Sequence, residues 1–167
     1  MKNLGLILGV LLAVGCGSDP TNFTGNYELA LVNGENNCEL DNWTVGETTT
    51  DVDVVVVQVE GESSADITVQ GFAGLAVTLI VGTNVFHGSV DGETLSGEII
   101  GDVTFNDGGC AYTVTARLSA TLQGDTITGT LRYTTPTNGH PDCGVRSATC
   151  QSVQNFNGTR PPAPPKR

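Results

Sequence analysis

The chain has 167 residues, enough for a single domain with its own core, and 22 of them are glycine. Its 18 acidic residues outnumber the 7 basic ones, giving a formal net charge of −11, and no lysine or arginine lies between Lys2 and Arg117. Such an acidic surface repels phosphate groups, which argues against the binding of nucleic acid and of anionic lipid headgroups.

Residues 1–15 have the pattern of a secretory signal peptide. Lys2 provides the positive charge that such signals carry, and Leu4–Val14 is an uninterrupted apolar run. The run is shorter than the roughly 20 residues of a transmembrane helix and matches the apolar part of an export signal. We therefore expect this segment to direct export and to be removed afterwards.

The apolar run ends in Ala13-Val14-Gly15-Cys16, which resembles the lipobox of bacterial lipoproteins, although alanine stands where leucine is commoner. The resemblance implies that Cys16 is lipidated and anchors the chain to a membrane of the cell envelope, at the outer membrane or the cell surface. Residues 16–21 then form a tether, of which Gly17–Thr21 reach roughly 17 Å when extended. The alternative is an ordinary signal peptide cleaved a few residues later, which leaves Cys16 as an unpaired thiol.

Residues 22–159 show a period-two alternation of apolar and polar side chains, which is typical of antiparallel strands with one solvent-exposed face. The clearest strands are expected at Phe23–Val32, Thr94–Phe105, Ala111–Gln123 and Thr126–Thr134. Weaker strands are expected at Val52–Glu60, Asp66–Gln70, Leu75–Val81, Val85–Val90 and Cys150–Phe156. Turn-forming residues such as Gly124-Asp125 separate them. No helical period competes after Val14, so we predict an all-β meander of consecutive hairpins.

A meander of eight or nine strands removes its exposed edges most directly by closing into a barrel, with a two-sheet sandwich as the alternative. The opening Phe23-Thr24-Gly25-Asn26-Tyr27 is similar to the first strand of the lipocalin and avidin group, the calycins, although tyrosine replaces the usual tryptophan. Leu95-Ser96-Gly97-Glu98 and Ile127-Thr128-Gly129-Thr130 resemble the small-residue strands of such barrels. The resemblance implies an up-and-down barrel over residues 22–159 and carries over no binding residue.

The other cysteines form an even set, as expected for disulfides in an exported domain: Cys38, Cys110, Cys143 and Cys150. In an eight-stranded meander, the loops that contain them lie at one end of the barrel. Closure makes the first and last strands neighbours, which favours a Cys38–Cys150 pair and leaves Cys110–Cys143. If Gly71–Gly74 is a turn, the count becomes nine and Cys38 moves to the opposite end, so the pairing stays open.

All three tyrosines, Tyr27, Tyr112 and Tyr133, fall on the predicted inner face of the barrel, beside small residues. Phenol groups that line an unfilled interior would orient a small ligand, as polar groups do in mostly apolar pockets. Alternatively, the small residues mark sharp bends and the tyrosines are ordinary core residues. Trp43 lies in the long loop Asn33–Thr50 at the barrel mouth, either as a lid or as a packing residue.

The sequence offers no set of acid, base and nucleophile, so we expect no enzymatic activity and assign no catalytic residue, metal or cofactor. His87 and Ser89 alternate on a strand face predicted to be exposed to solvent, and no Gly-x-Ser-x-Gly motif is present. Asp51 and Asp53 are candidate calcium ligands, but the EF-hand pattern is absent. His140-Pro141-Asp142 suits a turn as well as a pH-sensitive or metal-binding role.

Two functional hypotheses of different classes follow. We favour a non-enzymatic scaffold or interaction domain of the cell envelope, which predicts a filled barrel and an exposed apolar patch that contacts another protein. The alternative is a lipocalin-like carrier of a small apolar or amphipathic ligand, which predicts a cavity of roughly several hundred Å³ inside the barrel. Residues 160–167 are a proline-rich basic tail, either a loose end or a docking peptide.

Overall fold

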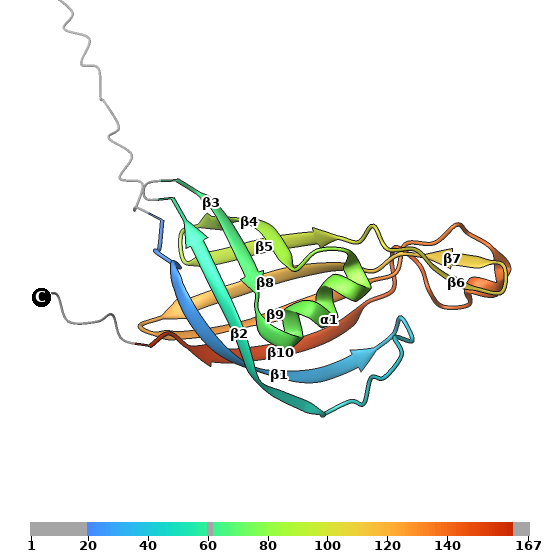
Figure 1. The fold of residues 1–167 in the computed structure, drawn as a ribbon, viewed down its shortest axis with the longest axis horizontal. Helices are drawn as coiled ribbons and strands as arrows, with labels where there is room; N and C mark the ends of the chain where they lie inside the picture. The colour runs from blue at the N-terminus through green and yellow to red at the C-terminus, as the bar shows by residue number, and fades with distance from the viewer. Residues whose placement is uncertain (1–19, 60–61, 162–167) are drawn as a thin grey trace, which may run out of the picture.

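The computed structural model describes residues 20–59 and 62–161, and its centre is a closed barrel of antiparallel strands (Figure 1). The eight barrel strands are β1 (Gly25–Asn36), β2 (Thr48–Gln58), β3 (Ser64–Val69), β4 (Val85–Asp91), β5 (Thr94–Ile100), β8 (Thr115–Gln123), β9 (Thr126–Thr134) and β10 (Ser152–Thr159). Each strand pairs with the next, and β10 returns to pair with β1, where Leu31 lies opposite Phe156. The predicted up-and-down barrel is therefore confirmed, and the sandwich alternative is wrong.

The alternation of residue types along each strand determines which side chains fill the barrel. In β5, Leu95 and Ile99 are buried, whereas Ser96 between them is exposed. β2 repeats this pattern with its alternating valines. Burying an aliphatic side chain of this size stabilises a fold by about 1.5–3 kcal/mol. Inward-facing side chains from all eight barrel strands together form one continuous core.

The connection between β3 and β4 is a helix, α1 (Gly71–Val81), which contacts β2 and β3 (Figure 1). The strand predicted over Leu75–Val81 is therefore wrong, and so is the prediction that no helix follows Val14. The segment is apolar at nearly every position, so strand and helical periods fit it equally well, and only packing against the barrel distinguishes them. Because α1 stands outside the ring of strands, the barrel keeps eight of them.

One face of α1 packs on the barrel core. Ala73 and Val77 repeat at helical spacing and contact the buried cluster. Gly74 permits this close approach, since a side chain there would collide with the Val69 carbonyl group. Gly82 then ends the helix at a φ of 96°, in the left-handed region that favours glycine.

The chain leaves the barrel after β5 and again after β9, and the two excursions form an arm (residues 101–114 and 135–151) that projects beyond one end of the barrel (Figure 1). Its elements are the hairpin of β6 (Phe105–Asp107) and β7 (Cys110–Tyr112) and the 3₁₀-helix η1 (Pro141–Cys143). Backbone hydrogen bonds join the two excursions, because the Asn138 N–H donates to the Ala111 carbonyl at 2.9 Å.

The arm explains why three strands have other limits than the sequence predicts. These are the strands predicted over Thr94–Phe105, Ala111–Gln123 and Cys150–Phe156. At Gly101 the chain approaches its return path so closely that a side chain would collide with the Val114 carbonyl group. The hydrophobic alternation continues through this crossing, so the pattern alone does not reveal where the chain departs from the barrel.

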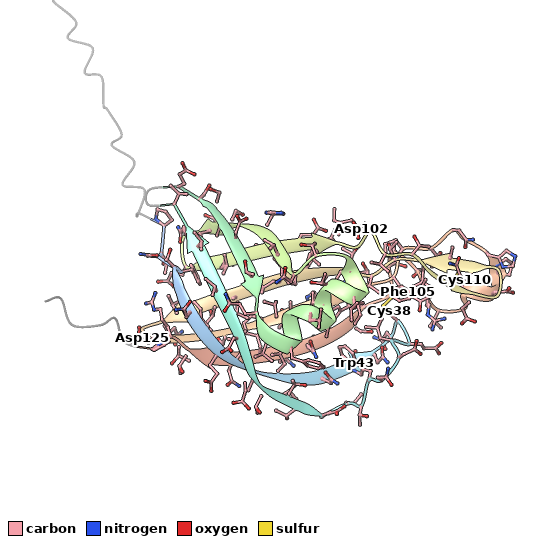
Figure 2. The ribbon with its side chains drawn as sticks, viewed as in Figure 1. Cys38, Trp43, Asp102, Phe105, Cys110 and Asp125 are labelled. Atoms are coloured by element: carbon pink, nitrogen blue, oxygen red, sulfur yellow. A yellow bond between two sulfur atoms is a disulfide. The ribbon has the colours of Figure 1, made fainter. Side chains whose placement is uncertain are left out.

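The two disulfides are the cysteine pairs that barrel closure favours. Cys38–Cys150 connects the loop after β1 to the segment before β10, with Cα atoms 5.1 Å apart. Cys110–Cys143 connects β7 to η1 within the arm, with Cα atoms 4.9 Å apart. Figure 2 shows Cys38 near the barrel end and Cys110 farther out in the arm. All four cysteines thus lie toward the predicted end, but they do not gather at a single mouth.

The two disulfides should contribute unequally to stability. The Cys38–Cys150 pair closes a sequence separation of 112 residues, whereas the Cys110–Cys143 pair closes one of 33. Because a crosslink removes more entropy from the unfolded chain when its loop is longer, replacing the first pair by alanine should cost about 1 kcal/mol more unfolding free energy than replacing the second. Urea titration of both double variants measures the difference. A larger loss from the arm pair would contradict the role of Cys38–Cys150 in holding the barrel closed.

Candidate functional site

Two of the three tyrosines lie in the barrel wall, and both hydroxyl groups are used inside the protein. The Tyr27 side chain is buried, and its hydroxyl donates to the Phe23 carbonyl at 2.7 Å. The Tyr133 hydroxyl donates to Gln154 Oε1 at 2.6 Å. Burial raises the pKa of Tyr27 and raises the pKa of Tyr133 far above its usual range. The two phenols therefore serve as neutral, hydrogen-bonded wall residues.

The third tyrosine lies in the arm and not in a barrel strand, although it packs partly buried against the core. Tyr112 belongs to β7 in the arm and stacks on Phe105 with ring centroids 5.3 Å apart. The Arg146 guanidinium lies over the same ring, 4.8 Å from its centroid, and forms an ion pair with Asp107 at 3.3 Å. This cluster holds the two excursions of the arm together. The prediction that all three tyrosines share one interior is therefore wrong for Tyr112.

Trp43 fixes the long loop between β1 and β2 against the barrel. Its ring meets that of Tyr133 edge-on, with centroids 5.7 Å apart, and its Nε1–H donates to the Gly34 carbonyl at 3.0 Å. Figure 2 places it below the end of α1. Both polar and apolar parts of the side chain are thus engaged within the protein, which favours the packing role over that of a lid.

Inward-facing side chains of the barrel strands form the buried core. The two best-formed hollows of the described chain measure about 450 Å³ and 340 Å³, and both are open to solvent. The larger is lined by residues of β1, β2, β9 and β10, and the smaller by residues next to and within β4 and β5. Tyr27 and Tyr133 contribute to the lining of neither.

The structure instead exposes an apolar surface on α1 that the sequence analysis missed. We call the outward side chains of this helix, Phe72, Leu75, Leu79 and Ile80, the apolar ridge; their exposed fractions are 87%, 56%, 68% and 46%. The opposite face of α1 packs on the core. A helix that is apolar all round is normally buried on every side. Had residues 71–81 been recognised as a helix, the lack of a polar face would have predicted burial on every side, so only the structure reveals that one apolar face is exposed.

The surroundings of the apolar ridge are acidic. At its beginning, Asp53 is exposed, and its carbonyl accepts the Gln70 N–H at 2.8 Å. At its end, the Asp102 N–H donates to the Val81 carbonyl at 3.0 Å, and the Asp102 carboxylate lies beside Gly82 (Figure 2). The sequence of β1 to β5 contains no lysine or arginine. None of the strands that come before and directly after the ridge in the chain therefore carries a lysine or arginine side chain.

His87 and Ser89 do not form a nucleophile pair. His87 Nδ1 lies 2.8 Å from Asp66 Oδ1 on the outer wall, and both side chains are largely exposed. Ser89 lies opposite Ser64 and Ser96 on the neighbouring strands. The arrangement is a cross-strand pair of a solvated sheet face, which contributes little to stability.

The other candidate ligands are used for local structure. The Asp51 carboxylate accepts a hydrogen bond from Thr50 Oγ1 at 2.8 Å. The Asp142 carboxylate accepts a hydrogen bond from the Gly109 N–H at 2.8 Å, which joins the η1 region to the hairpin of the arm. The backbone N–H of Asp142 donates to His140 Nδ1 within the η1 region. Across residues 20–59 and 62–161, no group of three or more His, Cys, Asp or Glu side chains is placed to hold a metal ion.

Cys16 and residues 1–15 lie outside the described residues, as do residues 162–167 of the tail. Within the described ranges, no helix has the length and apolar character needed to cross a membrane. Comparisons with protein-family models, curated protein sequences and solved structures give no match to this chain.

The raised tyrosine pKa values predict a loss of stability at alkaline pH. Both phenols have a higher pKa in the folded state than the ordinary value of 10.0, so each contributes stability that is fully present below pH 10. This contribution is lost as the pH rises through the pKa of the folded state. The described chain contains no lysine, and its four paired cysteines do not titrate, so tyrosines dominate this range. We expect the unfolding free energy to fall above about pH 10, and Tyr133→Phe to reduce that slope. Urea titrations at several pH values measure it; an unchanged slope would contradict the enclosed phenol.

Proposed function

We propose that this chain is a non-enzymatic lipoprotein of the bacterial cell envelope, anchored by a lipid on Cys16, whose barrel presents an interaction surface on α1. The observation that carries the proposal is the exposed apolar ridge on a helix whose opposite face packs on the core. Soluble monomers rarely leave contiguous apolar side chains exposed unless these contact another molecule.

The apolar ridge does not help to form the helix that bears it. Among the described residues no side chain caps the first turn of α1, that turn has no acidic residue, and the last turn has no basic residue. Packing of the inward face is therefore what holds α1 in place. Leaving a phenylalanine or leucine in water forgoes about 1.5–3 kcal/mol of burial energy per side chain. An interaction surface explains why large apolar residues stand at these positions.

The fold separates the proposed anchor from the apolar ridge. The Thr21 N–H donates to the Gly92 carbonyl at 3.0 Å, so the start of the domain lies beside the turn between β4 and β5. α1 follows β3 at the opposite end, where Figure 2 shows Asp102 far from Asp125 of the β8–β9 turn. A short tether from Cys16 would hold the first end near the membrane. The ridge would then lie at the end directed away from it.

Cysteine pairing supports export as part of this proposal. Both disulfides lie within one domain, and such bonds persist in oxidising compartments outside the cytoplasm. The apolar run and the lipobox-like Ala13-Val14-Gly15-Cys16 supply a route to such a compartment. The carrier alternative has weaker support, because the Tyr27 and Tyr133 hydroxyls bond to partners within the protein and neither side chain lines the two hollows described above.

Cell fractionation tests the proposed anchor. When the full chain is expressed in a bacterial host with an outer membrane, we expect it in the membrane fraction, and mass spectrometry should find lipid on the peptide that begins at Cys16. The Cys16→Ser variant should be exported and soluble, because a single free serine gives no lipid attachment. Recovery of both proteins in the same soluble fraction, with no lipid on Cys16, would contradict the lipoprotein proposal.

A further inference from the structure

We infer that the apolar ridge and the carboxylates at its two ends bind a cationic amphipathic segment of a partner protein, an inference that rests on the proposed function. Phe72, Leu75 and Leu79 follow the spacing i, i+3, i+7, which places them on one stripe of α1. A stripe of this kind packs against the apolar face of a second helix at an axial distance of about 8–10 Å. The ridge thus supplies the apolar half of a helix-docking surface.

Negative charge is concentrated at the C-terminal end of the ridge. The carbonyl groups of the last helical turn give that end a partial charge equivalent to about half an electron, and no basic residue of the turn balances it. The exposed Asp102 carboxylate lies beside Gly82 at the same end and adds its own charge. A lysine or arginine of a partner would be stabilised there by both.

The opposite end of the ridge offers a second carboxylate. Asp53 is exposed where β2 passes the start of α1. The eleven residues of α1 span about 16 Å, so cationic side chains about three turns apart on a partner helix match the separation of the two helix ends at which Asp53 and Asp102 lie. A partner that combines an apolar face with flanking cations therefore matches the ridge in both chemistry and length.

The same charges disfavour two other occupants. A second copy of the chain would bring acidic surfaces together, and four side chains on one short helix do not supply the roughly 800 Å² per partner that a stable dimer buries. A bilayer surface carries anionic headgroups, which are repelled by the acidic strands β1 to β5 and by the net charge of −11. Charge complementarity thus favours a cationic polypeptide.

A synthetic peptide tests this inference. The probe has leucine along one helical face and lysine along the other, and its matched control has glutamate in place of every lysine. Isothermal titration calorimetry measures binding to the full chain carrying Cys16→Ser, so that a lipid on that residue plays no part. We expect the lysine peptide to bind and the glutamate peptide not to bind. Equal binding of the two peptides, or binding of neither, overturns the inference.

Variants locate the binding. Leu75→Ser with Leu79→Ser should weaken binding of the lysine peptide about tenfold or more. The matched control is Val57→Ser with Val145→Ser, which removes side chains that are 56% and 49% exposed on β2 and in the arm, against 56% and 68% for the two leucines. This control should leave binding unchanged. Equal effects of the two double variants, or no effect of the ridge variant, overturn the inference.

Charge is tested separately by Asp53→Asn with Asp102→Asn, which preserves side-chain size. This variant should weaken binding and flatten its dependence on salt concentration, because two of the attractive charges are removed. Unchanged affinity and salt dependence would overturn the part that we assign to the carboxylates.

Two further measurements separate a failure of this inference from a failure of the proposed function. Sedimentation equilibrium detects self-association, and co-sedimentation with vesicles of phosphatidylcholine and phosphatidylglycerol detects membrane binding. If either is lost in the ridge variant while the lysine peptide does not bind, the cationic partner is wrong and the ridge is still an interaction surface. If peptide binding, self-association and vesicle binding are all absent, both the inference and the interaction role of α1 are wrong.

Discussion

In the closed barrel β10 pairs with β1, so that Leu31 lies opposite Phe156 and the first and last strands become neighbours. The other features follow from this pairing, because it converts a linear meander into a ring in which each barrel strand has two partners. A ring of eight strands has an interior that is either filled by its own side chains or wide enough for one small ligand. The Cys38–Cys150 disulfide joins the loop after β1 to the segment before β10 and so crosslinks the two strands whose pairing closes the barrel.

Two parts of the structure, α1 and the arm, do not belong to the ring of strands. α1 and the arm both leave the barrel at the end opposite the turn between β4 and β5 that Thr21 contacts. In the arm, Phe105 and Tyr112 stack on each other and pack against the core, and Arg146 covers Tyr112. Only one face of α1 packs on the core, which leaves the apolar ridge without a partner in the described chain. The location of the ridge is thus a consequence of how the barrel closes.

Period-two alternation was sufficient to predict the barrel strands, and their order made the two disulfide pairs the favoured choice. The same signal failed at residues 71–81, because an almost wholly apolar run fits a strand and a helix equally, and the close approach of Gly74 to the Val69 carbonyl is invisible in sequence. The apolar ridge was missed for that reason. Tyr112 was placed in the barrel because the alternation that it shares with Ala116 continues through Val114, where the chain returns from the arm past Gly101. Local pattern therefore predicted the ring, whereas tertiary contacts decided what stands outside it.

The central claim is that interior apolar residues hold the fold while those of the ridge do not. Urea unfolding of two matched truncations tests it most directly: Ile67→Ala, at a core side chain that is 2% exposed, and Leu79→Ala, at a ridge side chain that is 68% exposed. The account predicts a loss of about 2–5 kcal/mol for Ile67→Ala and a change within about 0.5 kcal/mol for Leu79→Ala. Comparable losses from both variants would show that the ridge belongs to the folding core and would contradict the account.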